Sequence, residues 1–290
     1  MINGDPIIAP SPPLGNRACY NPGMPKEVVF LKLGGSLITD KSRARTARPD
    51  TIRRLVEEIA QARKAVPGLR LVLGHGSGSF GHMEAKKFET AEGVRSAEDW
   101  RGFTVVWAAA DQLNRIMTDA LAAGGVPAVR IAPSSCAILE NGRIMEMPVA
   151  PVWSALDAGL VPVVYGDAVF DRTRGGGIAS TEMVFAHLAR SLHPQRILLA
   201  GIERGVFEDY PAREVLLPRI RAAGWETVRP KLEGSAHTDV TGGMLSKVQE
   251  MLELILREEN LQVLVFSGEI EGNVRRALSG ETLEGTKLEK

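Results

Sequence analysis

The chain has 290 residues, and its 35 Lys and Arg residues are balanced by 35 Asp and Glu residues, so its formal net charge is zero. This balance argues against a nucleic-acid partner, because affinity for nucleic acid depends mainly on clustered positive charge. Hydrophobic residues make up 44% of the chain and charged residues 24%, which is typical of a globular protein and not of a disordered one. No apolar run approaches the ~20 residues that a transmembrane helix needs, so no membrane partner is expected.

The first 25 residues differ from the rest of the chain. They are rich in Pro, Gly and Asn and show no hydrophobic periodicity, so we predict a disordered tail over residues 1–25 and a single domain over residues 26–290. They also lack the basic start and apolar core of a secretory signal. The only two cysteines, Cys19 and Cys136, are too few for a disulfide framework or a cysteine-based zinc site. These features predict a reduced, cytoplasmic protein.

From residue 27 onward, short apolar runs alternate with segments of helical periodicity. After the first run, Asp50 is expected to cap a helix whose apolar side chains recur on one face. Strands that alternate with helices predict a mainly parallel sheet with helices on both faces, that is, an α/β protein built as an open αβα sandwich with two lobes. Strands are predicted at residues 27–31, 69–73, 128–131, 161–165, 196–200 and 263–266, and helices at 52–59, 97–123, 152–158, 181–192, 212–223 and 244–255.

Glycine clusters mark four of these boundaries. Residues 34–35, 74–81 and 166 follow predicted strands, and residues 242–243 open a predicted helix. Glycine lets the backbone approach a ligand closely, and the N–H groups at the start of a helix attract anions. In an open parallel sheet, ligands bind beyond the carboxyl ends of the strands. The clusters therefore predict an elongated polyanionic ligand at this edge, such as the phosphate chain of a nucleotide.

Two nucleotide-binding signatures can be compared with these clusters. The P-loop pattern Gly-x-x-x-x-Gly-Lys-Ser/Thr is absent. Residues 76–81 fit Gly-x-Gly-x-x-Gly, but the acidic residue expected about 20 residues later falls at Glu98 and Asp99 with no intervening strand. The sequence disfavours both a P-loop enzyme and a dinucleotide-binding turn.

Five motifs, in order along the chain, carry a resemblance to a known family. Residues 32–36 (Lys-Leu-Gly-Gly-Ser), with Asp40-Lys41 after them, resemble the opening motif of the amino-acid-kinase superfamily. Residues 75–82 (His-Gly-Ser-Gly-Ser-Phe-Gly-His) narrow the resemblance to the isopentenyl phosphate kinase family. The remaining matches are Gly166-Asp167, residues 239–247 and residues 283–286. The resemblance implies the amino-acid-kinase-like fold, with an acceptor-phosphate-binding lobe at residues 26–165 and an ATP-binding lobe at residues 166–290.

The resemblance also implies a reaction. A kinase of this family transfers the γ-phosphate of ATP in line onto isopentenyl monophosphate, with dimethylallyl monophosphate as a further candidate acceptor. The diphosphate product is a building block of isoprenoids in an alternative mevalonate route. Mg²⁺ is expected with ATP, held mainly by phosphate oxygens and water with no dedicated protein site, because this hard cation prefers oxygen ligands. A homodimer is implied as well.

Individual residues receive roles from the same resemblance. Lys32 bridges the donor and acceptor phosphates, Asp167 orients Lys32, and His82 contacts the acceptor phosphate. Lys41 and Lys247 neutralise the phosphates of ATP, and Lys41 joins the first three as a catalytic residue. Further ATP contacts are expected at Gly34, Gly35, Ser36, Gly78, Gly201, Gly205 and Gly243. Further acceptor contacts are expected at Gly76, Ser77, Gly81 and Thr181, with Phe103 and Trp107 as an apolar wall and Trp107 limiting the length of the tail.

Two segments depart from the family pattern. Residues 180–182 read Ser-Thr-Glu where the family has Ser-Gly-Asp, and Ala200-Gly201 stands where the family has a Thr-Asp pair near the adenosine. The first change alters the loop that faces the transferred phosphate, and the second removes a carboxylate near the nucleotide. Two alternatives therefore stay open: a kinase of the same fold for another phosphate or phosphonate acceptor of the fosfomycin type, and a nucleotide-binding relative without catalytic activity.

Overall fold

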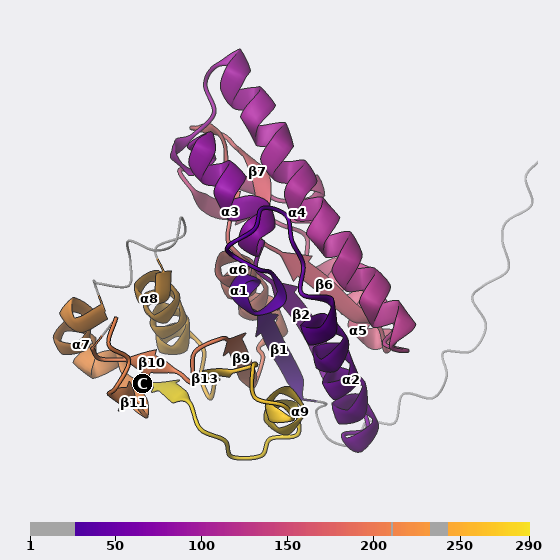
Figure 1. Cartoon of the computed structure of the whole chain (residues 1–290), viewed down its shortest axis with the longest axis vertical. Coiled ribbons are helices and arrows are strands. Elements are labelled where there is room, and N and C mark those ends of the chain that lie inside the picture. Colours follow the sequence, from indigo (N-terminus) through magenta and orange to yellow (C-terminus); the bar gives the residue numbers. More distant parts are fainter. Residues whose placement is uncertain (1–26, 210, 233–242) are drawn as a thin grey trace, which may run out of the picture.

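The computed structural model describes residues 27–209, 211–232 and 243–290 (Figure 1). The tail predicted over residues 1–25 and the motif residues 239–242 lie outside the described residues. No helix in the described ranges is both long and apolar enough to cross a membrane.

One large sheet forms the centre of the molecule. Its strands are parallel except for the pair formed by β13 (Gln262–Ser267) and β14 (Thr286–Glu289), which confirms the mainly parallel sheet. The strand β1 (Val28–Leu33) lies in the middle of the sheet, and all six of its residues are buried. The strand order is β12 (Arg219–Arg221), β14 (Thr286–Glu289), β13 (Gln262–Ser267), β9 (Arg196–Gly201), β1 (Val28–Leu33), β2 (Arg70–His75), β6 (Val161–Tyr165) and β3 (Ala128–Arg130).

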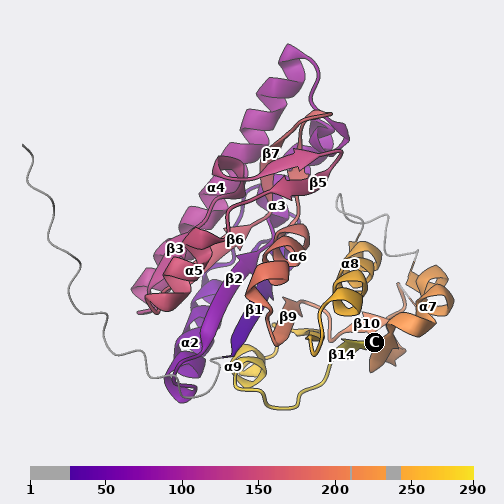
Figure 2. The same ribbon diagram turned by 180° about the vertical axis from the view of Figure 1, so that it is seen from behind.

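Helices cover both faces of this sheet, as predicted (Figures 1 and 2). Successive side chains of a strand point to opposite faces, so Leu31 contributes to one hydrophobic core and Phe30 to the other. The first core is completed by α2 (Pro49–Ala65), α4 (Ala97–Ala123) and α9 (Asn273–Leu278). The second is completed by α5 (Ala150–Asp157), α6 (Thr181–Leu192) and α8 (Gly243–Arg257).

A second, smaller sheet was not predicted. It lies beside the amino-terminal part of α4, where Figure 1 shows β7 (Asp167–Asp171) next to that helix. Its strands come from both of the proposed lobes: two lie before residue 165 and two after residue 166, so the functional division between residues 26–165 and 166–290 stays a prediction. The strand order is β5 (Arg143–Glu146), β4 (Ile138–Glu140), β7 (Asp167–Asp171) and β8 (Gly175–Ala179).

The prediction of a helix at residues 212–223 is wrong. This stretch holds β11 (Leu216–Leu217), which pairs with β10 (Val206–Phe207), and then β12 at the edge of the large sheet. Pro218 explains part of the difference, because a proline disfavours helical backbone at the residue before it and lacks an N–H group. The main-chain oxygen of Pro218 instead accepts a hydrogen bond from Lys287 N at 3.0 Å. A short helix, α7 (Trp225–Leu232), follows.

The start of α2 also differs from the prediction. The helix begins at Pro49, with Arg48 at the N-cap position, so Asp50 lies inside the first turn and does not cap the helix. Proline is favoured at the first helical position because its missing N–H group has no partner there. Asp50 forms an ion pair with Arg53 one turn later, which is a solvated surface contact.

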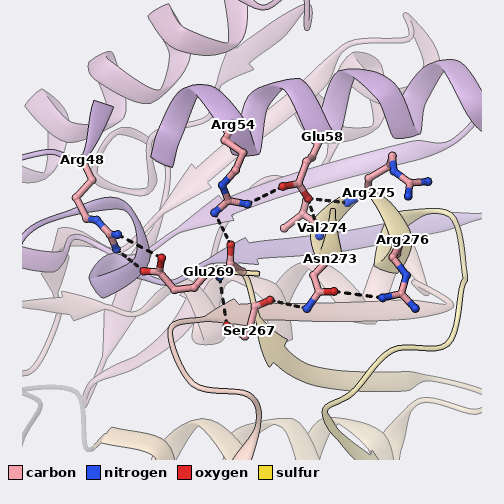
Figure 3. A network of polar contacts seen from close by, with 10 residues as sticks. Arg48, Arg54, Glu58, Ser267, Glu269, Asn273, Val274, Arg275 and Arg276 are labelled. Carbon is pink, nitrogen blue, oxygen red and sulfur yellow. Dashed lines mark hydrogen bonds and ion pairs between the residues drawn. The ribbon is translucent and has the colours of Figure 1, made fainter. Parts of the chain in front are cut away.

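A network of polar contacts anchors α2 to the segment that follows β13 (Figure 3). The carboxylate of Glu58, which is buried, accepts hydrogen bonds from the main-chain N–H groups of Val274 and Arg275 at 2.9 and 3.2 Å. Its other oxygen lies 2.6 Å from the guanidinium of Arg54, and Arg54 also donates to the Gly268 carbonyl at 2.7 Å. Glu58 thus satisfies the first N–H groups of α9 from a neighbouring helix.

Candidate active site

Two glycine-rich turns meet at the carboxyl end of the central strands. One joins β1 to α1 (Gly35–Ile38), and the other joins β2 to α3 (Gly78–Lys87). A Cβ atom on Gly35 would lie 2.4 Å from the main-chain nitrogen of Gly78, and one on Gly76 would lie 2.9 Å from that of Gly35. Only glycine permits this approach, so the turns are glycine-rich because they pack against each other as well as because they face a ligand.

A cavity of about 370 Å³ lies over these turns and gathers most of the residues predicted for the site. Both turns, the ends of β6 and β9, and the start of α6 and α8 all contribute to its lining. Residues far apart in the chain therefore converge on one cavity, as expected for strand ends that share one edge of a parallel sheet. The predicted residues that line it are Lys32, Gly34, Gly35, Ser36, Lys41, Gly76, Ser77, Gly81, His82, Asp167, Thr181, Gly201, Gly205, Gly243 and Lys247.

Three predicted residues lie elsewhere. Gly78 adopts a positive φ of 48°, and a Cβ atom there would lie 2.1 Å from Thr39 Oγ1, so it serves the packing of the two turns. Phe103 packs in a small buried cluster with Val94 and stands outside the lining. Trp107 is 43% exposed and donates from Nε1 to the hydroxyl of Ser134 at 3.2 Å. The structure brings none of the three to the cavity, and the limit on tail length assigned to Trp107 gains no support.

The buried ion pair between Lys32 and Glu182 lies at the centre of the cavity lining. Glu182 is in the first turn of α6, and both side chains are almost fully shielded from solvent. Burial would raise the pKa of the Glu182 carboxyl, but the charges of Lys32 and Lys247 hold it below its usual value. The sequence marked Glu182 only as a departure from the family pattern. Its partnership with Lys32 depends on how α6 meets β1, which no local signal reports.

Asp167 occupies the wall of the same cavity. Its carboxylate accepts hydrogen bonds from the N–H groups of Ser134 and Ala168, at 3.0 and 2.9 Å. Burial raises the pKa of this carboxyl to about 6, although the hydrogen bonds oppose the shift. These two hydrogen bonds fix the carboxylate, and the role of Asp167 in orienting Lys32 remains a prediction.

Beyond His82 the lining becomes apolar. His82 lies on α3, and one turn later Ala85 lines the cavity from the same helix. Val106 and Ala110, one turn apart on α4, form the facing wall, and Ile178 of β8 contributes from the second sheet. Val106 points to the cavity and Trp107 does not, because neighbouring residues on a helix differ in direction by about 100°. This end can hold a short hydrocarbon group.

The opposite end of the cavity carries cationic and apolar groups together. Lys41 and Lys247 line it, and the apolar side chains Ile202, Phe207 and Met244 lie around Gly201 and Gly205. Gly201 stands where the family has a carboxylate. A carboxylate is present two residues later, at Glu203, which lines the same end of the cavity and pairs with Arg213 at 3.0 Å. Cations near apolar surfaces suit a ligand that joins a phosphate chain to an aromatic base.

The fold and this site define a member of the amino acid kinase family, whose model matches residues 27–267. The isopentenyl phosphate kinase of Methanothermobacter thermautotrophicus is 34% identical over 268 residues, which cover 90% of this chain and 98% of that relative. The enzyme of the same name from Haloferax volcanii is 34% identical over 257 residues, covering 86% of this chain and 98% of its own.

Solved structures agree with these sequence relatives. The X-ray structures of isopentenyl phosphate kinase match with a TM-score of 0.76 and 32% identity, covering 90% of this chain and 99% of that chain. The crystal structure of an isopentenyl phosphate kinase substrate complex matches with a TM-score of 0.71 and 26% identity, with the same coverage. The chain belongs to the isopentenyl phosphate kinase family, so the resemblance drawn from its motifs is confirmed.

Proposed function

We propose that this protein transfers the γ-phosphate of ATP onto isopentenyl monophosphate. The observation that carries the proposal is the single cavity that runs from cationic, glycine-lined walls to an apolar end beyond His82. A phosphate monoester with a short branched tail fits such a gradient, with its phosphate at His82 and its tail between Ala85 and Ala110. A small phosphonate such as fosfomycin would leave the apolar end largely unfilled.

The proposed chemistry rests on positioning and charge neutralisation. Phosphoryl transfer requires little covalent chemistry from the protein, but two anionic reactants must be held together against their repulsion. Lys32 lies between the two ends of the cavity and is suited to bridge the donor and acceptor phosphates. Glu182 holds the ammonium group of Lys32 in place, and Lys41 and Lys247 neutralise the phosphates of ATP. His82 orients the acceptor phosphate through a ring nitrogen.

We propose that Mg²⁺ binds together with ATP. Among the described residues, no group of three or more His, Cys, Asp or Glu side chains is arranged to hold a metal ion. The carboxylates of Asp167, Glu182 and Glu203 line the cavity, and each is engaged by a protein group. This donor set fits a cation that is carried by phosphate oxygens and water. Bound in that way, Mg²⁺ would neutralise charge on the transferred phosphate.

We further propose that the protein is a homodimer. Phe170 of β7 is 49% exposed, although its ring packs 5.4 Å from that of Phe103 and 5.9 Å from that of Trp100. Trp107, one helical turn from Phe103, adds further exposed aromatic surface to this part of α4. Exposed aromatic side chains gathered on one surface are typical of a protein–protein interface. A second copy of the chain is the proposed partner.

An ADP-release assay tests the proposed reaction. Isopentenyl monophosphate, dimethylallyl monophosphate and fosfomycin are offered in turn with ATP and Mg²⁺. Turnover is expected with the prenyl phosphates, and His82→Ala should lower kcat/KM for them by about 100-fold, since it removes a contact to a charged group. The matched control is His193→Ala, because His193 is exposed on the far end of α6 and should retain wild-type activity.

Two outcomes of this assay contradict the proposal. Turnover of fosfomycin without turnover of isopentenyl monophosphate indicates a phosphonate kinase of the same fold. Binding of ATP without ADP release on any prenyl phosphate indicates a relative that has lost catalysis.

A further inference from the structure

His75 is a buried residue that the proposed reaction does not use. It is the last residue of β2, and none of its surface is exposed. Its ring stacks on that of Tyr165 in the neighbouring strand, with centroids 5.5 Å apart and planes within 5°. Burial lowers the pKa of the His75 imidazole to about 4, so the ring is neutral at physiological pH.

The neighbours of the ring determine which nitrogen carries the proton. Nδ1 lies 3.1 Å from the Gly76 carbonyl oxygen, and Nε2 lies 2.9 Å from the side-chain Nδ2 of Asn114 on α4. A carbonyl oxygen can only accept a hydrogen bond, so Nδ1 must donate. In a neutral ring Nε2 then accepts, and the Asn114 amide presents an N–H group to it. A single tautomer satisfies both contacts.

The contact with Gly76 orients the next peptide group. A trans peptide points its C=O and N–H groups in opposite directions, so holding the Gly76 oxygen toward His75 turns the Ser77 N–H away from it. Ser77 lines the cavity, and its N–H has no acceptor among the residues that the structure describes. Its hydroxyl lies beside Gly81, since a Cβ atom there would be 2.5 Å from Ser77 Oγ. The Ser77 N–H can thus donate a hydrogen bond to a ligand that lies close to His82.

The main-chain oxygen of His75 ties the same turn to two other parts of the cavity wall. Thr181 Oγ1 donates to it at 2.7 Å and Gly166 N at 3.2 Å. Both of these residues line the cavity. His75 therefore fixes the second glycine-rich turn relative to the end of β6 and the start of α6.

We infer that His75 is a positioning residue, whose Nδ1–H holds the Gly76 carbonyl so that the Ser77 N–H is presented to the acceptor phosphate. Asn114 maintains this arrangement by donating to Nε2, which keeps the proton on Nδ1. The inference rests on the proposed function, because it names the acceptor phosphate as the group that the turn receives.

Two substitutions at one position separate positioning from space filling. In His75→Asn the side-chain amide takes the place of Nδ1 and can still donate to Gly76, whereas in His75→Gln it takes the place of Nε2 and cannot. Both lose the stacking on Tyr165. His75→Gln should raise KM for isopentenyl monophosphate about tenfold with KM for ATP unchanged, while His75→Asn stays within about twofold of wild type. Equal effects of the two variants on acceptor KM overturn the inference.

A measurement on the wild-type protein does not depend on the variants folding. Nitrogen-15 NMR of the histidine side chains should show His75 protonated at Nδ1 only, between pH 6 and 8. A proton on Nε2 instead overturns the inference. Absence of turnover by the wild type would mean that the proposed function fails. Turnover by the wild type combined with equal behaviour of the two variants would mean that the inference alone fails.

Discussion

Glu182 replaces the aspartate of the family pattern with a carboxylate one methylene group longer, and it pairs with Lys32 inside the protein. A buried lysine keeps its charge only when a partner compensates for lost hydration. The arrangement thus keeps an ammonium group fixed in the cavity lining before any ligand binds. A preorganised charge of this kind costs no rearrangement during the reaction.

The first prediction concerns this pair. Glu182→Gln should lower kcat for ADP release by about 100-fold, because Lys32 loses the group that fixes its position. Glu182→Asp keeps the charge and should recover most of that loss. Steady-state kinetics with both substrates saturating measure the effect, and thermal melting of each variant checks that the fold is intact. Wild-type kcat in a folded Glu182→Gln protein would show that Lys32 is held by other groups.

Asp167 gives a prediction for the pH dependence of stability. Its pKa of about 6 in the folded protein exceeds the value of about 3.9 for an unperturbed aspartate, so the folded state holds this proton more tightly. The folded protein therefore loses stability as pH rises from about 4 to 6, by an amount on the order of 3 kcal/mol, and the loss levels off above pH 6.

Asp167→Asn removes this titration. Between pH 4 and pH 7 the free energy of unfolding of the wild type should fall relative to that of the variant, as measured by urea denaturation at each pH. Taking the difference between the two proteins cancels the titration of other groups, including His75, whose lowered pKa acts in the opposite direction. Parallel pH profiles would contradict the assignment.

At the scale of elements, the sequence predicted best those segments that carry a long apolar pattern of their own. The predicted bounds of α4, β6 and α6 match the structure. The second sheet escaped prediction because its strands are short, and β8 begins with three glycines. Its turns depend on the Asp171 carboxylate, which accepts N–H groups from Asn141, Gly142, Thr173 and Arg174. The contacts with Asn141 and Gly142 join residues 30 and 29 positions apart and leave no periodic signal.

The anchoring of α2 gives a prediction about two adjacent glutamates. Glu58→Gln should lower the free energy of unfolding by about 2 kcal/mol, because two N–H groups of α9 and the Arg54 guanidinium lose a charged, buried acceptor. Glu57 is exposed on the same helix, so Glu57→Gln is the matched control and should change stability by less than about 0.5 kcal/mol. Chemical denaturation of the three proteins provides the comparison, and equal effects would refute the role given to Glu58.

At the scale of the whole molecule, the sequence predicted where the cavity lies, but it did not predict which residue pairs with Lys32 or which residues form the apolar end. Glycine clusters at strand ends were sufficient to predict where the cavity lies, because parallel strands bring their carboxyl ends to one edge. The partner of Lys32 and the apolar end depend on how α6 meets β1 and how α3 packs on α4. Those relations come from packing between distant elements. The same packing decides that Val106 and Ala110, and not Trp107, face the cavity from α4.

The proposed homodimer yields the last prediction. Light scattering of the wild type should give a mass near twice the 31.3 kDa of one chain. Phe170→Asp places a charge in the exposed aromatic surface and should give a monomer, because a carboxylate buried in an interface without a partner is strongly unfavourable. Leu256→Asp is the matched control: Leu256 is 60% exposed on α8, away from this surface, and its variant should stay dimeric. A dimeric Phe170→Asp protein would place the interface on another face of the molecule.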